Sequence, residues 1–153
     1  MMPRASRSLS RADSVLSPTP PELEKLGFRP GKVHAFLAGV LEVGGGLLLA
    51  LGLLTPFGSA ATVAVMVVAA VAVHGRNGFF LQTNGFEYTF VIGGAALALA
   101  FSGPGRYAFD AALGLGWSGW AWGLAALVAG LVGAAASLAT RATGAPVASS
   151  LSA

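Results

Sequence analysis

The chain has 153 residues, of which 55% are hydrophobic and only 10% are charged. A soluble domain usually carries about 25% charged residues, so this composition excludes an ordinary water-soluble globular domain. The absence of cysteine excludes disulfide bonds, thiolate nucleophiles and cysteine-ligated iron–sulfur clusters. The apolar residues are gathered in blocks, which is typical of membrane-spanning helices.

The first 21 residues are rich in Ser, Arg and Pro, which predicts a disordered basic arm. No apolar core of about 7–15 residues follows the arginines, so we predict no cleavable signal peptide. A basic arm can bind nucleic acid, but beside a membrane helix it more commonly sets topology or contacts anionic lipid. We therefore expect the lipid bilayer, and no nucleic acid, as its partner.

Four apolar segments follow the arm. The first has the length of a helix rising about 33 Å, which is enough to cross a bilayer. The second is rich in Val and Ala, but an isolated strand in lipid would leave its backbone groups unpaired, so a helix is expected there too. The predicted fold is all-α, a four-helix transmembrane bundle over residues 22–141 with a flexible C-terminal tail at 142–153. The predicted spans are residues 33–54, 57–73, 86–102 and 117–140.

Small residues recur at four-residue spacing in the first and last spans, for example at Gly119 and Gly123. Such residues let membrane helices approach closely, within one chain or between copies of it. The three tryptophans of the chain lie at the start of the last span, where indoles favour the membrane interface. These patterns predict a compact bundle and allow a homo-oligomer.

Glu42 lies inside the first predicted span, with Ala38, Gly39, Gly45 and Gly46 on its own helical face. A lipid-facing carboxylate would cost about 2.5 kcal/mol or more, so we expect Glu42 to point into the bundle. It is then either a proton-carrying or ligand-binding group, or a buried carboxylate that only fixes helix packing.

A polar segment, residues 74–88, separates the second and third spans. It is either a solvated turn with aromatic anchors or part of a binding site. Because the turn at residues 55–56 is tight, the first two spans should be antiparallel, which brings this segment to the same end as His34. Helix geometry places Glu42 about 12 Å below His34. The predicted site in this half of the bundle comprises Glu42, His34, His74, Glu87, Arg76 and Asn84.

Arg106 and Tyr107 are predicted at the opposite end of the bundle, near Thr55. Two histidines and two glutamates could hold a metal or haem, but none of these pairs has a helical ligand spacing, so we predict no metal site. No phosphate-binding loop or catalytic triad is present, and no catalytic residue is assigned.

The charge distribution sets an expected orientation. Six of the nine Lys and Arg residues precede the first span. Arg76 lies between the second and third spans and Arg141 directly follows the fourth, whereas only Arg106 lies in a connection on the other side. The positive-inside rule then places the N-terminus of this multi-pass membrane protein in the cytoplasm.

An ordered set of motifs resembles the DoxX family of small bacterial membrane proteins over about residues 22–114. The motifs lie at residues 27–31, 34–39, 41–42, 44–46, 52–56, 77–80, 84–88 and 103–107. The resemblance implies a four-helix integral membrane protein, in some members a subunit of a thiosulfate:quinone oxidoreductase or a related assembly. It also implies the bacterial cell membrane as the location, and a first helix before residue 26, where this sequence has the polar residues 1–21. Either the last span takes the place of that helix, or the helix lies upstream of this sequence.

Three functions follow as hypotheses. The first is an accessory subunit of a quinone-linked redox complex, non-catalytic rather than an enzyme in itself. The chain itself has no recognisable flavin, haem or iron–sulfur motif, so the electrons would come from partner proteins. A quinone is the ligand that the resemblance implies. The second is a small proton or solute transporter. The third is a structural membrane scaffold without its own activity.

Overall fold

The computed structural model describes residues 21, 24, 27–74, 78–83 and 85–141. The predicted N-terminal arm, except for Pro21, and the predicted C-terminal tail lie outside the described residues. The described part of the chain is helical and contains no strand, which confirms the all-α prediction.

Each predicted span corresponds to one helical segment. The ends differ from the prediction by three residues or fewer when the π-helical turn after the second helix is included. The first helix is α3, Gly31–Leu51. The second is α4, Thr55–Ala69, which continues as a π-helical turn over Ala70–His74. The third and fourth are α5, Glu87–Ser102, and α7, Trp120–Ala139.

Three of these helical segments are long and apolar enough to cross a membrane: Gly31–Leu51, Thr55–His74 and Trp120–Ala139. Helix α5 has 16 residues. It rises only about 24 Å, less than the roughly 30 Å of a hydrocarbon core. Two short helices join the long ones, η2 at Leu81–Thr83 and α6 at Phe109–Ala112.

The chain divides into two compact units, of which the first comprises Met1–Leu37 and Thr140–Ala153. Within this unit Phe28 is buried and forms an isolated antiparallel bridge with Arg141. The Phe28 ring lies 5.2 Å from the His34 ring, centroid to centroid, and the Arg141 guanidinium lies 5.9 Å from the Phe28 centroid. Phe28 therefore organises the described part of this unit.

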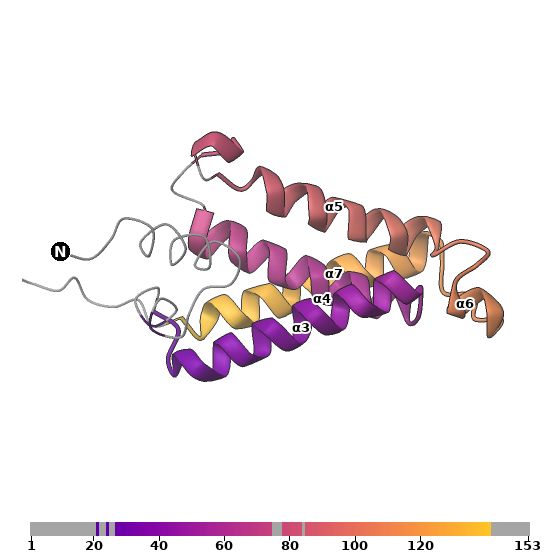
Figure 1. Cartoon of the computed structure of the whole chain (residues 1–153), viewed down its shortest axis with the longest axis horizontal. Coiled ribbons are helices and arrows are strands. Elements are labelled where there is room, and N and C mark those ends of the chain that lie inside the picture. The colour runs from indigo at the N-terminus through magenta and orange to yellow at the C-terminus, as the bar shows by residue number, and fades with distance from the viewer. Residues whose placement is uncertain (1–20, 22–23, 25–26, 75–77, 84, 142–153) are drawn as a thin grey trace, which may run out of the picture. The chain divides into compact units, whose positions relative to one another are not determined.

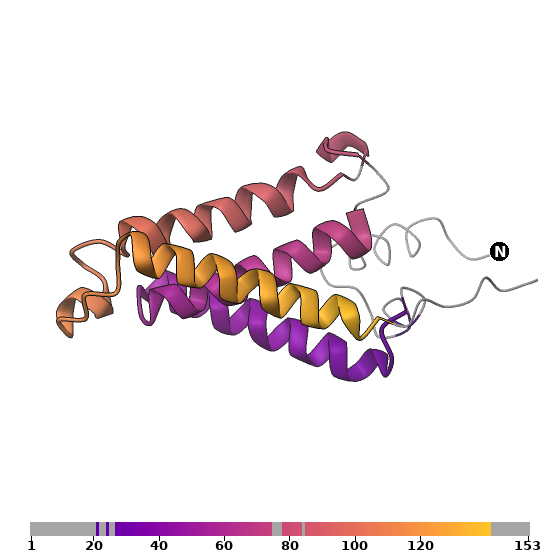
Figure 2. The same cartoon turned by 180° about the vertical axis from the view of Figure 1, so that it is seen from behind.

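The second unit, Ala38–Ala139, contains the bundle. Helix α4 packs against both α5 and α7, and α6 lies at the end of the bundle where α5 ends and α7 begins (Figures 1 and 2). Small residues let the helices approach closely. Gly130 of α7 lies against Val63 of α4, and Gly45 of α3 lies against Gly58 of α4. The Ser59 hydroxyl, fully buried, donates a 2.7 Å hydrogen bond to the carbonyl oxygen of Ala96.

The bundle has an interior of small side chains and an exterior of large apolar ones. Ala96, Ala100 and Ala126 are buried, whereas Phe90 and Val132 are 66% and 62% exposed. Lipid solvates large apolar side chains as well as a protein core does, so membrane helices associate through small residues. The distribution therefore agrees with helices in a membrane.

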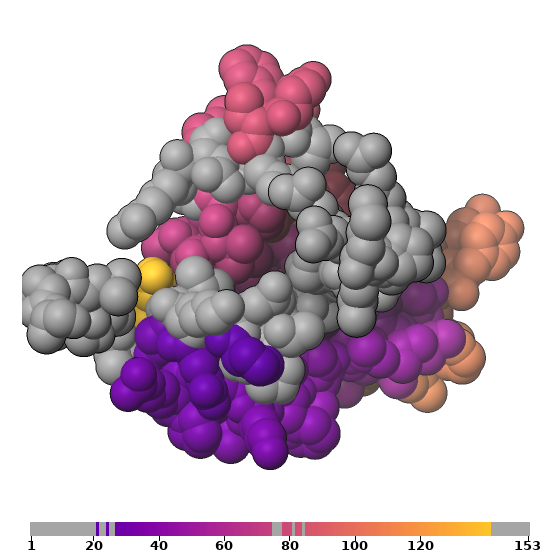
Figure 3. Space-filling view, turned by 60° about the vertical axis from the view of Figure 1, so that its left-hand side comes forward, coloured from indigo at the N-terminus to yellow at the C-terminus, as the bar shows by residue number. Residues whose placement is uncertain are grey.

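The segment 78–86 carries an aromatic cluster at the start of α5. The Phe79 ring makes edge contacts with the rings of Phe80, Phe86 and Phe90. Backbone hydrogen bonds from Phe86 to Gly78 and from Glu87 to Phe79 close the turn. Figure 3 shows this segment, in rose, protruding from the surface around it, and Phe80 is 63% exposed.

Candidate functional site

An apolar groove with one carboxylate runs between α3, α4 and α5. Its volume is about 350 Å³, and Glu42 and Thr62 supply its polar side chains. The Thr62 hydroxyl donates a 2.9 Å hydrogen bond to the carbonyl oxygen of Gly58, one turn earlier in α4. The remaining lining is apolar and comes from all three helices: Gly46, Leu49, Val65, Met66, Ile92, Ala95, Ala96 and Leu99.

Glu42 does not lie inside the bundle as the sequence predicted. Its residue is exposed on the single chain, although it borders the groove. The prediction relied on the small residues around Glu42, which were expected to pack on a neighbour. Of the three glycines on that face, Gly45 packs closely on α4, whereas positions Gly39 and Gly46 have open space beside them.

The other predicted residues of this site are only partly described. His74 ends the π-helical turn, Glu87 begins α5, and both are half-buried. His34 belongs to the other unit, so its predicted convergence with Glu42 stays a prediction. Arg76 and Asn84 lie outside the described residues.

Arg106 and Tyr107 lie next to the turn between α3 and α4. They line a cleft of about 240 Å³ together with Leu51 and Gly52. Both are exposed, Tyr107 to 92%. The Arg106 guanidinium lies 5.3 Å from the centroid of the Tyr107 ring, at cation–π distance.

The same turn holds a buried carboxylate, Asp110, that the sequence analysis did not select. Its residue is 1% exposed. Asp110 accepts hydrogen bonds from the Leu54 amide at 2.8 Å, the Thr55 amide at 2.9 Å and the Thr55 hydroxyl at 2.7 Å. Its own amide donates to the carbonyl oxygen of Gly52 at 2.9 Å.

These bonds satisfy amides at the start of α4. Leu54 precedes the helix in a left-handed conformation, with φ of 49°, and has no side chain able to cap it. Burial of the Asp110 carboxylate raises its pKa, but the hydrogen bonds from Thr55 and Leu54 outweigh burial and hold the pKa below its ordinary value of 3.8. The carboxylate is therefore ionised at neutral pH and has a capping role.

The signal for Asp110 in the sequence was indirect. Helix α4 begins at Thr55–Pro56, and the residue before it is Leu, which cannot act as an N-cap. A cap from elsewhere in the chain was therefore required, and Asp110 is the one carboxylate after Glu87.

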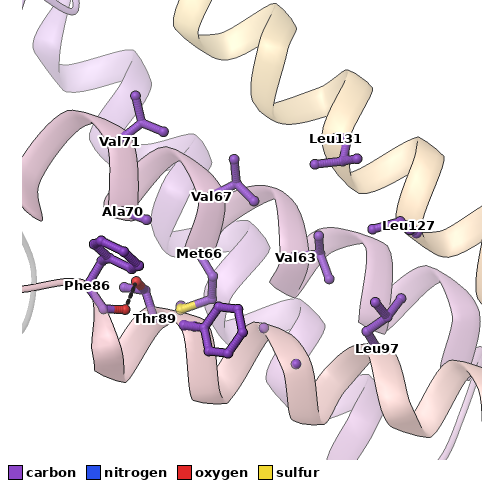
Figure 4. A pocket seen from close by; sticks show the side chains of 13 residues that line it. Val63, Met66, Val67, Ala70, Val71, Phe86, Thr89, Leu97, Leu127 and Leu131 are labelled. Atoms are coloured by element: carbon purple, nitrogen blue, oxygen red, sulfur yellow. Dashed lines mark hydrogen bonds between the residues drawn. The ribbon is translucent and has the colours of Figure 1, made fainter. Parts of the chain in front are cut away.

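A second cavity, about 320 Å³ in volume, lies between α4, α5 and α7. Figure 4 shows Met66, Phe86 and Leu131 among the side chains around it. Its polar side chain, Thr89, donates a 2.8 Å hydrogen bond to the carbonyl oxygen of Phe86. Such a cavity suits the apolar tail of a ligand better than a polar head group.

No three histidine, aspartate or glutamate side chains come together as metal ligands in the described part of the chain. Glu42 and Asp110 also serve different sites, one in the groove and one at the α3–α4 turn. The arrangement therefore offers a carboxylate able to exchange a proton or a hydrogen bond with a ligand in an apolar groove.

One comparison with known proteins, that with protein families, gave a match. The DoxX family model matches residues 13–75, a shorter segment than the one over which the motifs were recognised. Neither the comparison with curated proteins nor that with solved structures gave a match. The matched segment contains α3, α4 and Glu42, and it confirms the resemblance of this apolar helical protein to the DoxX family.

Proposed function

We propose that this protein is an accessory, non-catalytic subunit of a quinone-linked redox assembly in the membrane, and that the Glu42 groove receives the quinone head group. The observation that carries the proposal is the single carboxylate in a largely apolar groove, two of whose three helices, α3 and α4 with its π-helical turn, are long enough to cross a membrane. A carboxylate in hydrocarbon costs about 2.5–3.5 kcal/mol on insertion scales, so Glu42 needs a polar partner there.

The groove suits such a ligand in size and chemistry. Its volume of about 350 Å³ falls within the usual range for small-molecule sites, roughly 300–1,000 Å³. A quinone has a polar ring on an apolar tail, and the apolar lining from α4 and α5 would contact ring and tail. A protonated Glu42 would donate a hydrogen bond to a ring oxygen of the quinone. The Thr62 oxygen, whose proton is engaged with Gly58, could accept one from a hydroxyl of the reduced quinol.

The role of the chain in this proposal is to bind and orient. A bound quinone supplies the electron acceptor, and a partner protein supplies the electrons. Glu42, at the edge of the groove, would hold or pass a proton at the ring oxygen. The low dielectric of the apolar lining would strengthen that hydrogen bond.

A structural scaffold is the second candidate, because the groove is open on its α3 side. Positions Gly39 and Gly46 flank Glu42 and have no atom within 4 Å of an added Cβ. Such a face also accepts a helix of another protein, with Glu42 paired across the contact. A transporter would need the same face for oligomerisation, and flux in proteoliposomes would reveal it.

The test is photolabelling of the full-length protein in mild detergent with an azidoquinone, followed by mapping of the labelled peptides. We expect label on peptides of α3, α4 or α5 that line the groove, and competition by excess unlabelled quinone. Glu42→Gln should reduce labelling severalfold, since an amide N–H is a weaker hydrogen-bond donor to the quinone carbonyl than a carboxyl O–H. Glu87→Gln is the matched control, because Glu87 does not line the groove.

Equal labelling of the wild type and Glu42→Gln would refute the role of Glu42. Label elsewhere in the chain would refute the groove itself. Purification from native membranes without a redox partner would instead favour the scaffold, and a dimer lost in Glu42→Gln would establish the α3 contact.

A further inference from the structure

The segment 103–119 lies at one end of the bundle and joins α5 to α7. The Asp110 amide binds the carbonyl oxygen of Gly52 at 2.9 Å, and the Gly119 amide binds that of Phe101 at 2.9 Å. The rings of Phe57 and Trp117 are 5.7 Å apart, centroid to centroid. The end of α3, the start of α4, the end of α5 and the start of α7 therefore meet here, as Figure 1 shows beside α6. Helices crossing a bilayer would place this segment at one membrane surface.

Large side chains of this end segment, residues 103–119, point away from the protein. Tyr107 is 92% exposed, Phe109 54% and Leu113 62%, and Trp120 just beyond the segment is 74% exposed. A water-facing surface rarely gathers so much apolar area. At the head-group level of a bilayer, aromatic side chains are favoured.

No described residue neutralises the positive charge of Arg106 in this segment. Arg106 is exposed, and among the described residues its charged group contacts only the Tyr107 ring. The carboxylate of the same segment, Asp110, is buried and engaged with Leu54 and Thr55. The surface around Arg106 thus attracts an anion.

A preformed cleft lies beside this charge. It has a volume of about 240 Å³, and its walls are residues 49–52 and 104–108, including Arg106 itself. The hydrogen bond from Asp110 to Gly52 ties the two walls together. Arg106 therefore stands at the edge of a fixed cleft, not on an unanchored loop.

We propose that this cleft binds the head group of an anionic phospholipid, with the lipid phosphate on the Arg106 guanidinium and the acyl chains along Tyr107 and Phe109. Arginine pairs with phosphate through two parallel hydrogen bonds. The exposed aromatic side chains next to Arg106 favour a lipid over a free anion, because a free anion has no apolar part to bury against them. Leu49 also lines the Glu42 groove, but Glu42 itself does not line this cleft.

The three tryptophans of the chain, Trp117, Trp120 and Trp122, all lie at this end and report on the site. In the test, phosphatidylglycerol that carries brominated acyl chains is added stepwise to the full-length protein in mild detergent. Binding is followed by the quenching of tryptophan fluorescence. Brominated phosphatidylcholine, which is zwitterionic, measures the binding that does not depend on charge.

We expect phosphatidylglycerol to bind the wild type more tightly than phosphatidylcholine. Arg106→Gln should weaken phosphatidylglycerol binding about fivefold, the effect of about one favourable contact between a basic residue and anionic lipid. It should leave phosphatidylcholine binding unchanged. Lys32→Gln, which removes an exposed charge in the first turn of α3, is the matched control and should bind as the wild type does.

Equal affinities for the two lipids in the wild type, or unchanged phosphatidylglycerol affinity in Arg106→Gln, would overturn the proposal. Inorganic phosphate at millimolar concentration should not displace the brominated lipid, and displacement would show that the site takes free anions. Circular dichroism of Arg106→Gln should match the wild type, since the substituted side chain is exposed.

Discussion

Oδ2 of Asp110 accepts hydrogen bonds from both the amide and the hydroxyl of Thr55, at 2.9 and 2.7 Å. The two residues are 55 positions apart in the chain. Through this contact the loop after α5 supplies the N-terminal cap of α4, which the residues before α4 do not provide. The α3–α4 turn and the α5–α7 connection are thereby joined at one end of the bundle.

Replacement of Asp110 by Asn should destabilise the protein. An amide keeps only one acceptor oxygen for three donors and carries no charge, and hydrogen bonds to charged groups contribute about 1.5–3 kcal/mol. We expect a loss of about that size in the free energy of unfolding, measured by SDS titration in mixed micelles with circular dichroism. Thr55→Ser, which keeps the hydroxyl, should lose much less, and an Asp110→Asn protein as stable as wild type would contradict the capping role.

The stability of the wild type should depend on pH in the acid range. The pKa of Asp110 in the folded protein lies below the ordinary value of 3.8, so its contribution is complete above that pH. It is lost as pH falls from 3.8 through the folded-state pKa, because in that range the unfolded state binds a proton that the folded state does not. The melting temperatures of the wild type and Asp110→Asn should approach each other as pH falls from about 6 to about 2. A constant difference between them would argue against an ionised Asp110.

Gly52→Ala should be strongly destabilising. Gly52 has φ of +58°, and an added Cβ would collide with Ala108 and touch Pro104 at 3.0 Å. The left-handed conformation alone costs a non-glycine residue roughly 1–2 kcal/mol. Gly44→Ala is the control, because it lies within α3 with open space around it and should leave the SDS unfolding midpoint unchanged or raise it. Equal midpoints for the two variants would contradict the close contact of the turn with residues 104–108.

Gly130→Ala and Gly133→Ala should differ, although both lie in α7. A Cβ at Gly130 would lie 2.8 Å from Val63 Cγ1 and 3.0 Å from the carbonyl oxygen of Ala60, so α7 would have to move away from α4. Overpacking of this kind costs about 1–3 kcal/mol. At Gly133 the nearest atom is 3.6 Å away, an ordinary contact. The melting temperature of Gly130→Ala in detergent should be well below that of Gly133→Ala, and the reverse order would disprove the α4–α7 packing.

The helical architecture could be predicted from the sequence because its signal is local. Apolar blocks of membrane length, with Gly, Pro and polar residues between them, give the ends of α4, α5 and α7 closely. The break at Thr55–Pro56 was expected to end the first span, and instead it opens α4, since proline is well suited to the first helical turn.

The candidate site was harder to predict because its geometry is not local. Asp110 reads as an ordinary loop carboxylate until the fold brings it to Thr55. The orientation of Glu42 depends on which helix, if any, covers Gly39 and Gly46, and periodicity within α3 carries no information on the neighbour.

The capping of α4 by Asp110 also bears on how this protein can be recombined with relatives. The segment matching the DoxX model ends at residue 75, so it contains the amides of Leu54 and Thr55 but not the carboxylate that satisfies them. A chimera that exchanges only this segment would combine the α3–α4 turn of one parent with the Asp110-bearing residues 104–115 of the other. Exchange of residues 104–115 together with the matched segment would keep donor and acceptor from the same parent, and the crossover points should be chosen accordingly.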